Sequence, residues 1–257
     1  MPAPPVRMAF QRNCPVRTRR AIRYHTPMET DHIAANITKV LESVSTSAAK
    51  YGRDASDITV LAVSKTHPAS AVRAAAACGL AQFGENYLQE AEEKIAACAD
   101  LDLVWHFIGP LQSNKTRRIA ACFDWVHSVD RAKLLQRLNE QRDVHRSPLN
   151  ICLQVNVSGE ASKAGVAPGE LPALLDLAAE LPRLRLRGLM AIPAPAAGFT
   201  EQKAAFDELA ALMAAARERH PSMDTLSMGM SGDMEAAIAA GSTLLRVGTA
   251  IFGPRAA

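Results

Sequence analysis

Short apolar runs alternate along the chain with longer segments in which apolar residues recur every three or four positions. The first run lies in ITVLAVSKTHP, residues 58–68, where a stretch of mostly apolar residues ends in Ser-Lys-Thr-His-Pro. Such a run is typical of a strand buried in a parallel sheet, and Pro68 favours its end. Similar runs predict strands at 58–64, 81–84, 104–109, 124–129, 149–156, 185–192, 225–229 and 243–249.

The segments between these runs have helical spacing. A first helix is expected over 31–51, where apolar residues share one face, Asp31 is a suitable N-cap and Gly52 is placed to end the helix. The clearest amphipathic stripe lies in 200–219, with its charged residues on the opposite face. The other predicted helices are 69–78, 88–98, 113–121, 130–144, 168–180 and 232–240.

Eight strands alternating with helices in a chain of 257 residues predict a single (β/α)8 TIM-type barrel, which typically has about 250 residues. A doubly wound open sheet is the rival fold, but no G-x-G-x-x-G follows the first strand, which argues against a dinucleotide site there. Because few residues follow the last strand, the helix at 31–51 is expected to take the place of the eighth outer helix. We assign the barrel to residues 28–257.

Charge separates the first 27 residues from the barrel. Residues 1–27 hold six arginines and no acidic residue, which leaves 23 basic and 26 acidic residues for the rest of the chain. The segment has neither helical nor strand periodicity, so we expect a disordered basic extension. It resembles a transit peptide in composition, but the good helix just after Met28 favours a simple tail or an upstream start. The mildly acidic body gives no reason to expect a nucleic-acid partner.

Composition bounds the compartment and the kind of site. No apolar stretch approaches the roughly 20 residues needed to cross a bilayer, so no membrane association is expected. The five cysteines are scattered without a C-x-x-C pair, which fits a reducing cytoplasm and argues against a zinc site. We expect a cytoplasmic monomer without a metal.

Polar residues follow several of the predicted strands, at the barrel end where chemistry takes place in this fold. Lys65 ends the first strand, and Arg246 stands in the eighth, its neighbour in a closed barrel. Either side chain has an ordinary explanation: a lysine snorkelling to water, or an arginine in a structural ion pair. Loops after strands seven and eight commonly hold phosphate in barrels. The residues suited to that role here are Gly229, Ser231, Gly248 and Thr249.

A lysine, an arginine and a phosphate cradle on adjacent strands indicate a phosphorylated aldehyde cofactor, pyridoxal 5′-phosphate (PLP). The stretches LAVSKTHP, FGENYLQE, WHFIGPLQSNK, VNVSGEASKAG, GLMAI and LSMGMSGDMEAAIAAGSTLLRVGTAIFG closely resemble the PLP homeostasis protein family. That family has the fold of the barrel domain of alanine racemase, and the resemblance runs from about Met28 to Gly253.

The resemblance implies a role for each residue of the site. Lys65 would form the Schiff base, and Arg246 would face the pyridine nitrogen. Asn86 of FGEN and His106 of WHFIG would line the pocket from the second and third strands. His67 stands where many relatives have a lysine, which concerns only the rim of the pocket. The phosphate would be held by Ser231, Gly248 and Thr249.

Other conspicuous side chains are expected to be structural. Trp105 and Trp125 lie in strands and are expected to pack in the core. The histidines at 127, 145 and 220 lack the spacing of metal ligands.

Three observations favour a carrier over an enzyme. Arginine stays protonated in proteins, so a contact with Arg246 would leave the ring nitrogen unprotonated and weaken the ring as an electron sink. A racemase also needs a base on the second face of the substrate; in alanine racemases this is a tyrosine of a separate β-domain, which we do not expect here. Tyr24 lies in the extension, Tyr51 ends a helix and Tyr87 is turned aside where a helix begins.

We therefore expect a protein that stores or delivers PLP and buffers the free aldehyde, with apo PLP-dependent enzymes as its partners. A weak amino-acid racemase and an aldolase-type barrel that uses Lys65 without PLP remain as alternatives. For release of the cofactor, Lys163 in the loop after the fifth strand is a candidate second amine. The alternative interpretation, which we favour slightly, is an ordinary solvated loop lysine.

Overall fold

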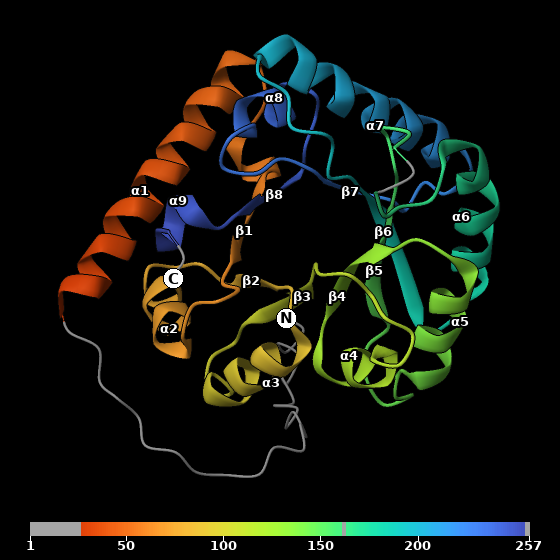
Figure 1. Ribbon diagram of the computed structural model, residues 1–257, viewed down its shortest axis with the longest axis horizontal. Coiled ribbons are helices and arrows are strands. Elements are labelled where there is room, and N and C mark those ends of the chain that lie inside the picture. Colours follow the sequence, from red (N-terminus) through yellow and green to blue (C-terminus); the bar gives the residue numbers. More distant parts are fainter. Residues whose placement is uncertain (1–26, 161–162, 255–257) are drawn as a thin grey trace, which may run out of the picture.

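The computed structural model describes residues 27–160 and 163–254, and in this part of the chain eight parallel strands close into a barrel in the order of the sequence. Figure 1 shows this ring of strands surrounded by helices. The strands are β1 (Thr59–Val63), β2 (Gln82–Glu85), β3 (Val104–Phe107), β4 (Trp125–Val129), β5 (Leu149–Gln154), β6 (Leu184–Met190), β7 (Thr225–Ser227) and β8 (Leu244–Val247). The predicted (β/α)8 barrel is confirmed.

Helices cover the outside of the ring. They are α1 (Pro27–Lys50), α2 (Ala69–Ala77), α3 (Leu88–Ala97), α4 (Thr116–Cys122), α5 (Ala132–Gln141), α6 (Leu171–Glu180), α7 (Phe199–Arg219), α8 (Met234–Ala239) and α9 (Thr249–Phe252). Short 3-10 helices, η1 (Ala55–Asp57) and η2 (Pro168–Glu170), precede β1 and α6. Helix α1 packs between α8 and α2 (Figure 1), so it occupies the place of the eighth outer helix as predicted.

The first helix differs from its predicted start. It begins at Pro27 and not after Asp31, because proline suits the first helical turn, where its missing N–H is not needed. Its end agrees with the prediction, since Gly52 has φ of +67°, the left-handed conformation that stops helices. The basic extension predicted for residues 1–27 lies almost wholly outside the described residues.

Alternation along each strand separates the two faces of the sheet. Phe83 pairs with Trp105 in the register of β2 and β3, and their rings contact each other in the layer beneath the helices. Trp105 is buried, as predicted. The neighbouring positions point into the barrel, and the register aligns Leu61 with Arg246, Val63 with Gly84, and Gly84 with His106. Polar side chains thus share the barrel interior with apolar ones.

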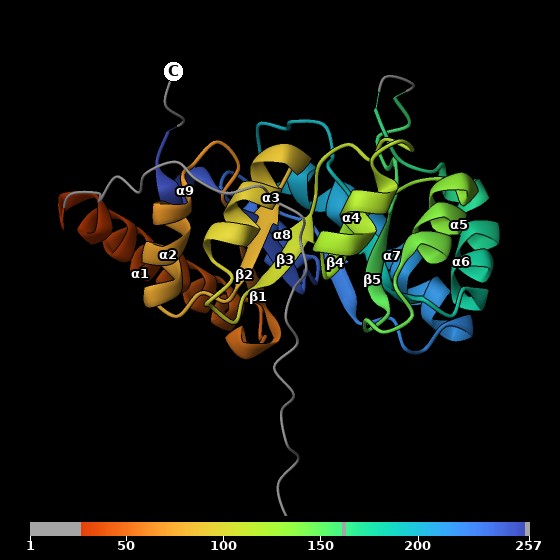
Figure 2. The ribbon, with the colours of Figure 1, turned by 90° about the horizontal axis from the view of Figure 1, so that it is seen from below.

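All strands run in one direction, so their carboxyl ends open on one face of the barrel. In Figure 2 this face is uppermost, and it carries the loops that follow the strands together with α9. No helix in the described part of the chain is both long and apolar enough to cross a bilayer. Among the same residues, no group of His, Cys, Asp or Glu is arranged to hold a metal ion.

Candidate functional site

Lys65 lies in a tight turn directly after β1. It is half-buried, and the backbone on either side is held by bonds from Ser64 N–H to the Gly84 carbonyl (3.0 Å) and from His67 N–H to the Ser64 carbonyl (3.1 Å). β1 already ends at Val63, before this turn, and Pro68 instead stands at the N-cap of α2. The side chain of Lys65 therefore leaves from the carboxyl end of β1, at the open face of the barrel.

Arg246 lies on the neighbouring strand and is buried inside the barrel mouth. Its Nη1 donates to the carbonyl oxygen and the hydroxyl of Ser227, at 2.6 and 2.8 Å, and its Nη2 donates to the Ala191 carbonyl at 2.9 Å. Burial lowers the pKa of Arg246 to about 10, so the guanidinium still carries its charge at neutral pH. No salt bridge within the described residues involves Arg246, in contrast to the structural ion pair considered from the sequence.

The loops after β7 and β8 lie beside these two residues. Gly229 has φ of +93°, and a Cβ there would lie 2.5 Å from the Cβ of Ala237, so only glycine fits where the loop passes α8. Its carbonyl accepts the N–H of Arg246 at 3.0 Å, which ties the loop to β8. Gly248 caps α9, and both Ser231 and Thr249 are exposed. Backbone and hydroxyl donors are thus available at the open face.

The two pocket residues expected from strands two and three differ in depth. Asn86 follows β2, and its Oδ1 is buried without a hydrogen-bond partner among the described residues. His106 is fully buried inside the barrel, level with Val63 in the register and hence one pleat below Lys65. Its ring stacks on Trp125 at 5.2 Å between centroids. His106 Nε2 also lacks a partner in the described part of the chain.

A buried chain of hydrogen bonds links His106 to Arg246. His106 Nδ1 lies 2.9 Å from His127 Nε2, and His127 Nδ1 lies 2.8 Å from the hydroxyl of Ser227, which accepts from Arg246. Burial lowers the pKa of His106 to about 3 and holds the pKa of His127 well below its ordinary value. Both imidazoles are therefore neutral at physiological pH. The positive charge of Arg246 also disfavours protonation of His127.

Sequence reasoning missed His127 and Ser227 as members of this network. Each occupies an inward-facing position in an apolar strand, and a polar residue in such a position is the signal that could have identified them. The two partners of His127, His106 and Ser227, lie 21 and 100 residues away from it in sequence. The pairing itself is therefore visible only in three dimensions.

Lys163 lies in the loop between β5 and η2, at the same open face as Lys65. Its Nζ is 3.2 Å from Glu160 Oε1 and 3.4 Å from the hydroxyl of Ser158. The side chain is mostly covered, with 25% of its surface exposed. These bonds hold the amine within its own loop.

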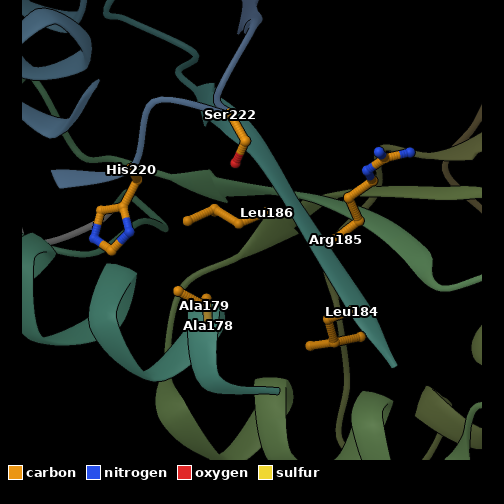
Figure 3. Close-up of a pocket in the computed structure, with 7 residues that line it drawn as sticks. All are labelled: Ala178, Ala179, Leu184, Arg185, Leu186, His220 and Ser222. Atoms are coloured by element: carbon orange, nitrogen blue, oxygen red, sulfur yellow. The ribbon is translucent and has the colours of Figure 1, made fainter. Parts of the chain in front are cut away.

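A surface depression of about 200 Å³ lies at the opposite end of the barrel. Figure 3 shows it between the end of α6, the start of β6 and the segment around His220 and Ser222. Because Leu184 and Arg185 stand at the amino end of β6, the depression is remote from Lys65. Active sites of this fold lie at the carboxyl ends of the strands, so we assign the candidate site to the mouth around Lys65 and Arg246.

Comparison with known proteins identifies relatives over nearly the whole barrel. The family of alanine racemase N-terminal domains matches residues 30–256. The pyridoxal phosphate homeostasis protein of Pseudomonas aeruginosa is 60% identical over 223 residues, which cover 87% of this chain and 96% of that protein. The protein of the same name from Escherichia coli K12 is 53% identical over 226 residues, covering 87% of this chain and 97% of the relative.

A solved structure gives the same result. PipY of Synechococcus elongatus, in a structure with PLP bound, is 39% identical with a TM-score of 0.75, and the match covers 86% of this chain and all of that one.

Proposed function

The chain belongs to the pyridoxal phosphate homeostasis protein family, with the fold of the alanine racemase N-terminal domain, and from this premise we propose that it binds PLP through a Schiff base on Lys65. In this role it stores and delivers the cofactor and buffers the free aldehyde. Apo PLP-dependent enzymes are the partners that would receive it. We further propose that it acts as a monomer in the cytoplasm.

The observation that carries the proposal is the placement of Lys65 and Arg246 on adjacent strands at one barrel mouth. The register of β1 and β8 aligns Leu61 with Arg246, and Lys65 follows in the turn after β1, nearer the opening. An amine and a fixed guanidinium at different depths suit the two ends of a flat aldehyde-bearing ring. Lys65 would hold PLP by condensing its amine with the aldehyde of the cofactor, whose oxygen would leave as water with the two protons of the amine.

The surrounding residues fit the remaining parts of the cofactor. Gly229 and Gly248 bring backbone close to the mouth, and Ser231 and Thr249 add hydroxyl donors for a phosphate. The Oδ1 of Asn86, which has no hydrogen-bond partner among the described residues, is a polar atom that a ligand could satisfy. His106, at its deeper level, supports the site from below through His127 and Ser227.

The charge on Arg246 supports a carrier without substantial turnover. A charged guanidinium beside the pyridine nitrogen would donate a hydrogen bond and transfer no proton, so the ring would be a weak electron sink. In the described part of the chain, the hydroxyl of Tyr51 is engaged, donating to Glu235 at 2.9 Å, and Tyr87 stands 54% exposed at the start of α3. Tyr24 lies outside the described residues.

Borohydride trapping tests the proposal. The purified protein is incubated with PLP, reduced and digested, and we expect the pyridoxyl group on Lys65. Lys65→Ala should lose the near-visible absorbance band while keeping its circular dichroism and melting temperature, because a half-buried lysine in a turn adds little core packing. Lys203→Ala, which removes another half-buried lysine, on α7, is the matched control. A band retained by Lys65→Ala would show that another lysine holds the cofactor.

A further inference from the structure

A largely buried group of three charged residues and a serine lies behind the turn that carries Lys65, on the outer side of the sheet. Ser64, Glu85, Glu90 and Lys94 form this group, which we call the Lys94 cluster. Lys94 and Glu90 come from α3, Glu85 ends β2, and Ser64 follows β1. The side chains of Lys94 and Glu85 are 5% and 0% exposed.

Every N–H of the Lys94 ammonium is used inside the cluster. Nζ donates to the carbonyl of Ser64 at 2.5 Å, to Glu85 Oε1 at 2.7 Å and to Glu90 Oε1 at 2.5 Å. The hydroxyl of Ser64 also donates to Glu85 Oε1, at 2.6 Å. Ser64 is therefore fixed through both its backbone and its side chain.

The cluster also holds the residue on the other side of Lys65. Glu90 Oε1 accepts the backbone N–H of Thr66 at 2.6 Å. Thr66 has φ of +66°, the only positive value outside glycine in the described residues, and a β-branched side chain disfavours that conformation. Such strain persists only where surrounding bonds enforce it. The bonds from the cluster are placed to do so.

Stability alone does not account for the cluster. Replacing a buried ion pair by apolar residues is often neutral or stabilising. Here the second carboxylate oxygen, Glu85 Oε2, is buried without a hydrogen-bond partner among the described residues. Burial raises the pKa of Glu85, the direction expected for a carboxylate that is incompletely solvated. The arrangement instead concentrates its bonds on Ser64 and Thr66, the two neighbours of Lys65.

We propose that the Lys94 cluster positions Lys65 for reaction with an aldehyde, by holding the Ser64–Thr66 turn in its strained conformation. This inference rests on the proposed function, because it takes Lys65 as the reacting amine. Glu85, Glu90 and Lys94 are positioning residues and touch no reacting atom. The turn directs the amine into the mouth before the cofactor arrives, so bond formation needs little reorganisation.

The experiment measures how fast the apo protein forms a Schiff base, by stopped-flow absorbance, with PLP and separately with pyridoxal. Pyridoxal lacks the phosphate, so it reports on the amine apart from the phosphate loops. Glu90→Ala is the primary variant, since Glu90 is 29% exposed and its loss keeps the Lys94–Glu85 pair. Lys94→Met would leave buried carboxylates without their cation and is expected to impair folding.

We expect Glu90→Ala to slow the reaction by about tenfold with both aldehydes, the scale of a displaced reacting group. Glu93→Ala, an exposed position on the same helix, is the matched control and should react like the wild type. Equal rate constants for Glu90→Ala and Glu93→Ala would overturn the proposal. It would also be overturned if Glu90→Ala slowed the reaction with PLP but not the reaction with pyridoxal.

A second pair of variants tests the strained turn. Glycine adopts φ near +66° without steric cost, so Thr66→Gly in the Glu90→Ala background should recover part of the rate, whereas Thr66→Val should not. If Thr66→Gly does not raise the rate constant in the Glu90→Ala background, the strained turn does not determine the rate of Schiff-base formation. Borohydride mapping of the wild type separates this inference from the proposed function: a label on another lysine refutes the function itself, and a label on Lys65 leaves the rate constants to decide on the cluster.

Discussion

Arg246 holds Ser227 by two hydrogen bonds from a single nitrogen, Nη1, which donates to the backbone carbonyl at 2.6 Å and to the hydroxyl at 2.8 Å. The same hydroxyl contacts His127, so the guanidinium at the barrel mouth is joined to an imidazole chain in the barrel interior. Since all of these groups are buried, each depends on its neighbours for hydrogen bonds that water would otherwise provide. A substitution at one of these residues should therefore weaken the hydrogen bonds of the others.

Arg246→Ala should still bind PLP, because the bond to Lys65 and the phosphate loops remain. We expect an altered absorbance spectrum of the bound cofactor and a free energy of unfolding lower by about 1–3 kcal/mol, since buried oxygens of Ser227 and Ala191 lose their donor. Absorbance titration against pH and urea denaturation measure the two effects. If the spectrum and its pH titration are identical to those of the wild type, Arg246 does not contact the pyridine nitrogen of the cofactor.

Ser227→Ala removes the link between Arg246 and His127. It leaves His127 Nδ1 buried without its partner, so we expect unfolding to be easier by about 1–3 kcal/mol, with PLP still bound. Urea denaturation of the apo protein gives the value. The control is Ser222→Ala, which changes an exposed serine in the loop before β7 (Figure 3). If Ser227→Ala lowers the free energy of unfolding no more than this control does, the hydrogen bond between Ser227 and His127 does not contribute to stability.

His106 should make stability depend on pH. Burial lowers its folded pKa from 6.5 to about 3, so the unfolded chain binds a proton that the folded protein does not. Its contribution to stability is present above pH 6.5 and lost progressively as the pH falls toward about 3. In His106→Phe the slope of unfolding free energy against pH should decrease by up to about 1.4 kcal/mol per pH unit in this window.

The measurement is urea denaturation at several pH values between 7 and 4. His145→Phe, at an exposed position, is the matched control and should retain the wild-type slope. If His106→Phe also retains it, the imidazole of His106 titrates in the folded protein much as it does in the unfolded chain.

Lys163→Ala tests release of the cofactor. If the amine of Lys163 takes PLP from Lys65 by exchange of one Schiff base for another, the variant should load normally and transfer PLP more slowly to an apo-enzyme. The contacts with Glu160 and Ser158 must first open, so Glu160→Gln should speed transfer. Loading is followed by absorbance and transfer by recovery of the acceptor's activity. Equal transfer rates with equal loading would remove Lys163 from the mechanism.

Local pattern was sufficient for the barrel and for placing the candidate site at one end of it. Apolar runs of strand length alternate with amphipathic helices, and helix boundaries depend on neighbours in sequence, such as Pro68 before α2 or Gly52 after α1. Once a barrel is inferred, Lys65 and Arg246 must belong to adjacent strands, because the first and last strands of a closed barrel are neighbours. The quoted motifs added the family.

Tertiary structure alone decided how these residues are held. The His106–His127–Ser227 chain joins β3, β4 and β7 across the barrel interior, and the Lys94 cluster joins α3 to the ends of β1 and β2. Both depend on strand register and on which face each side chain occupies, which a one-residue shift would reverse. The sequence identifies the ionisable groups, but whether burial leaves an imidazole neutral or an ammonium enclosed by carboxylates follows from the packing around it.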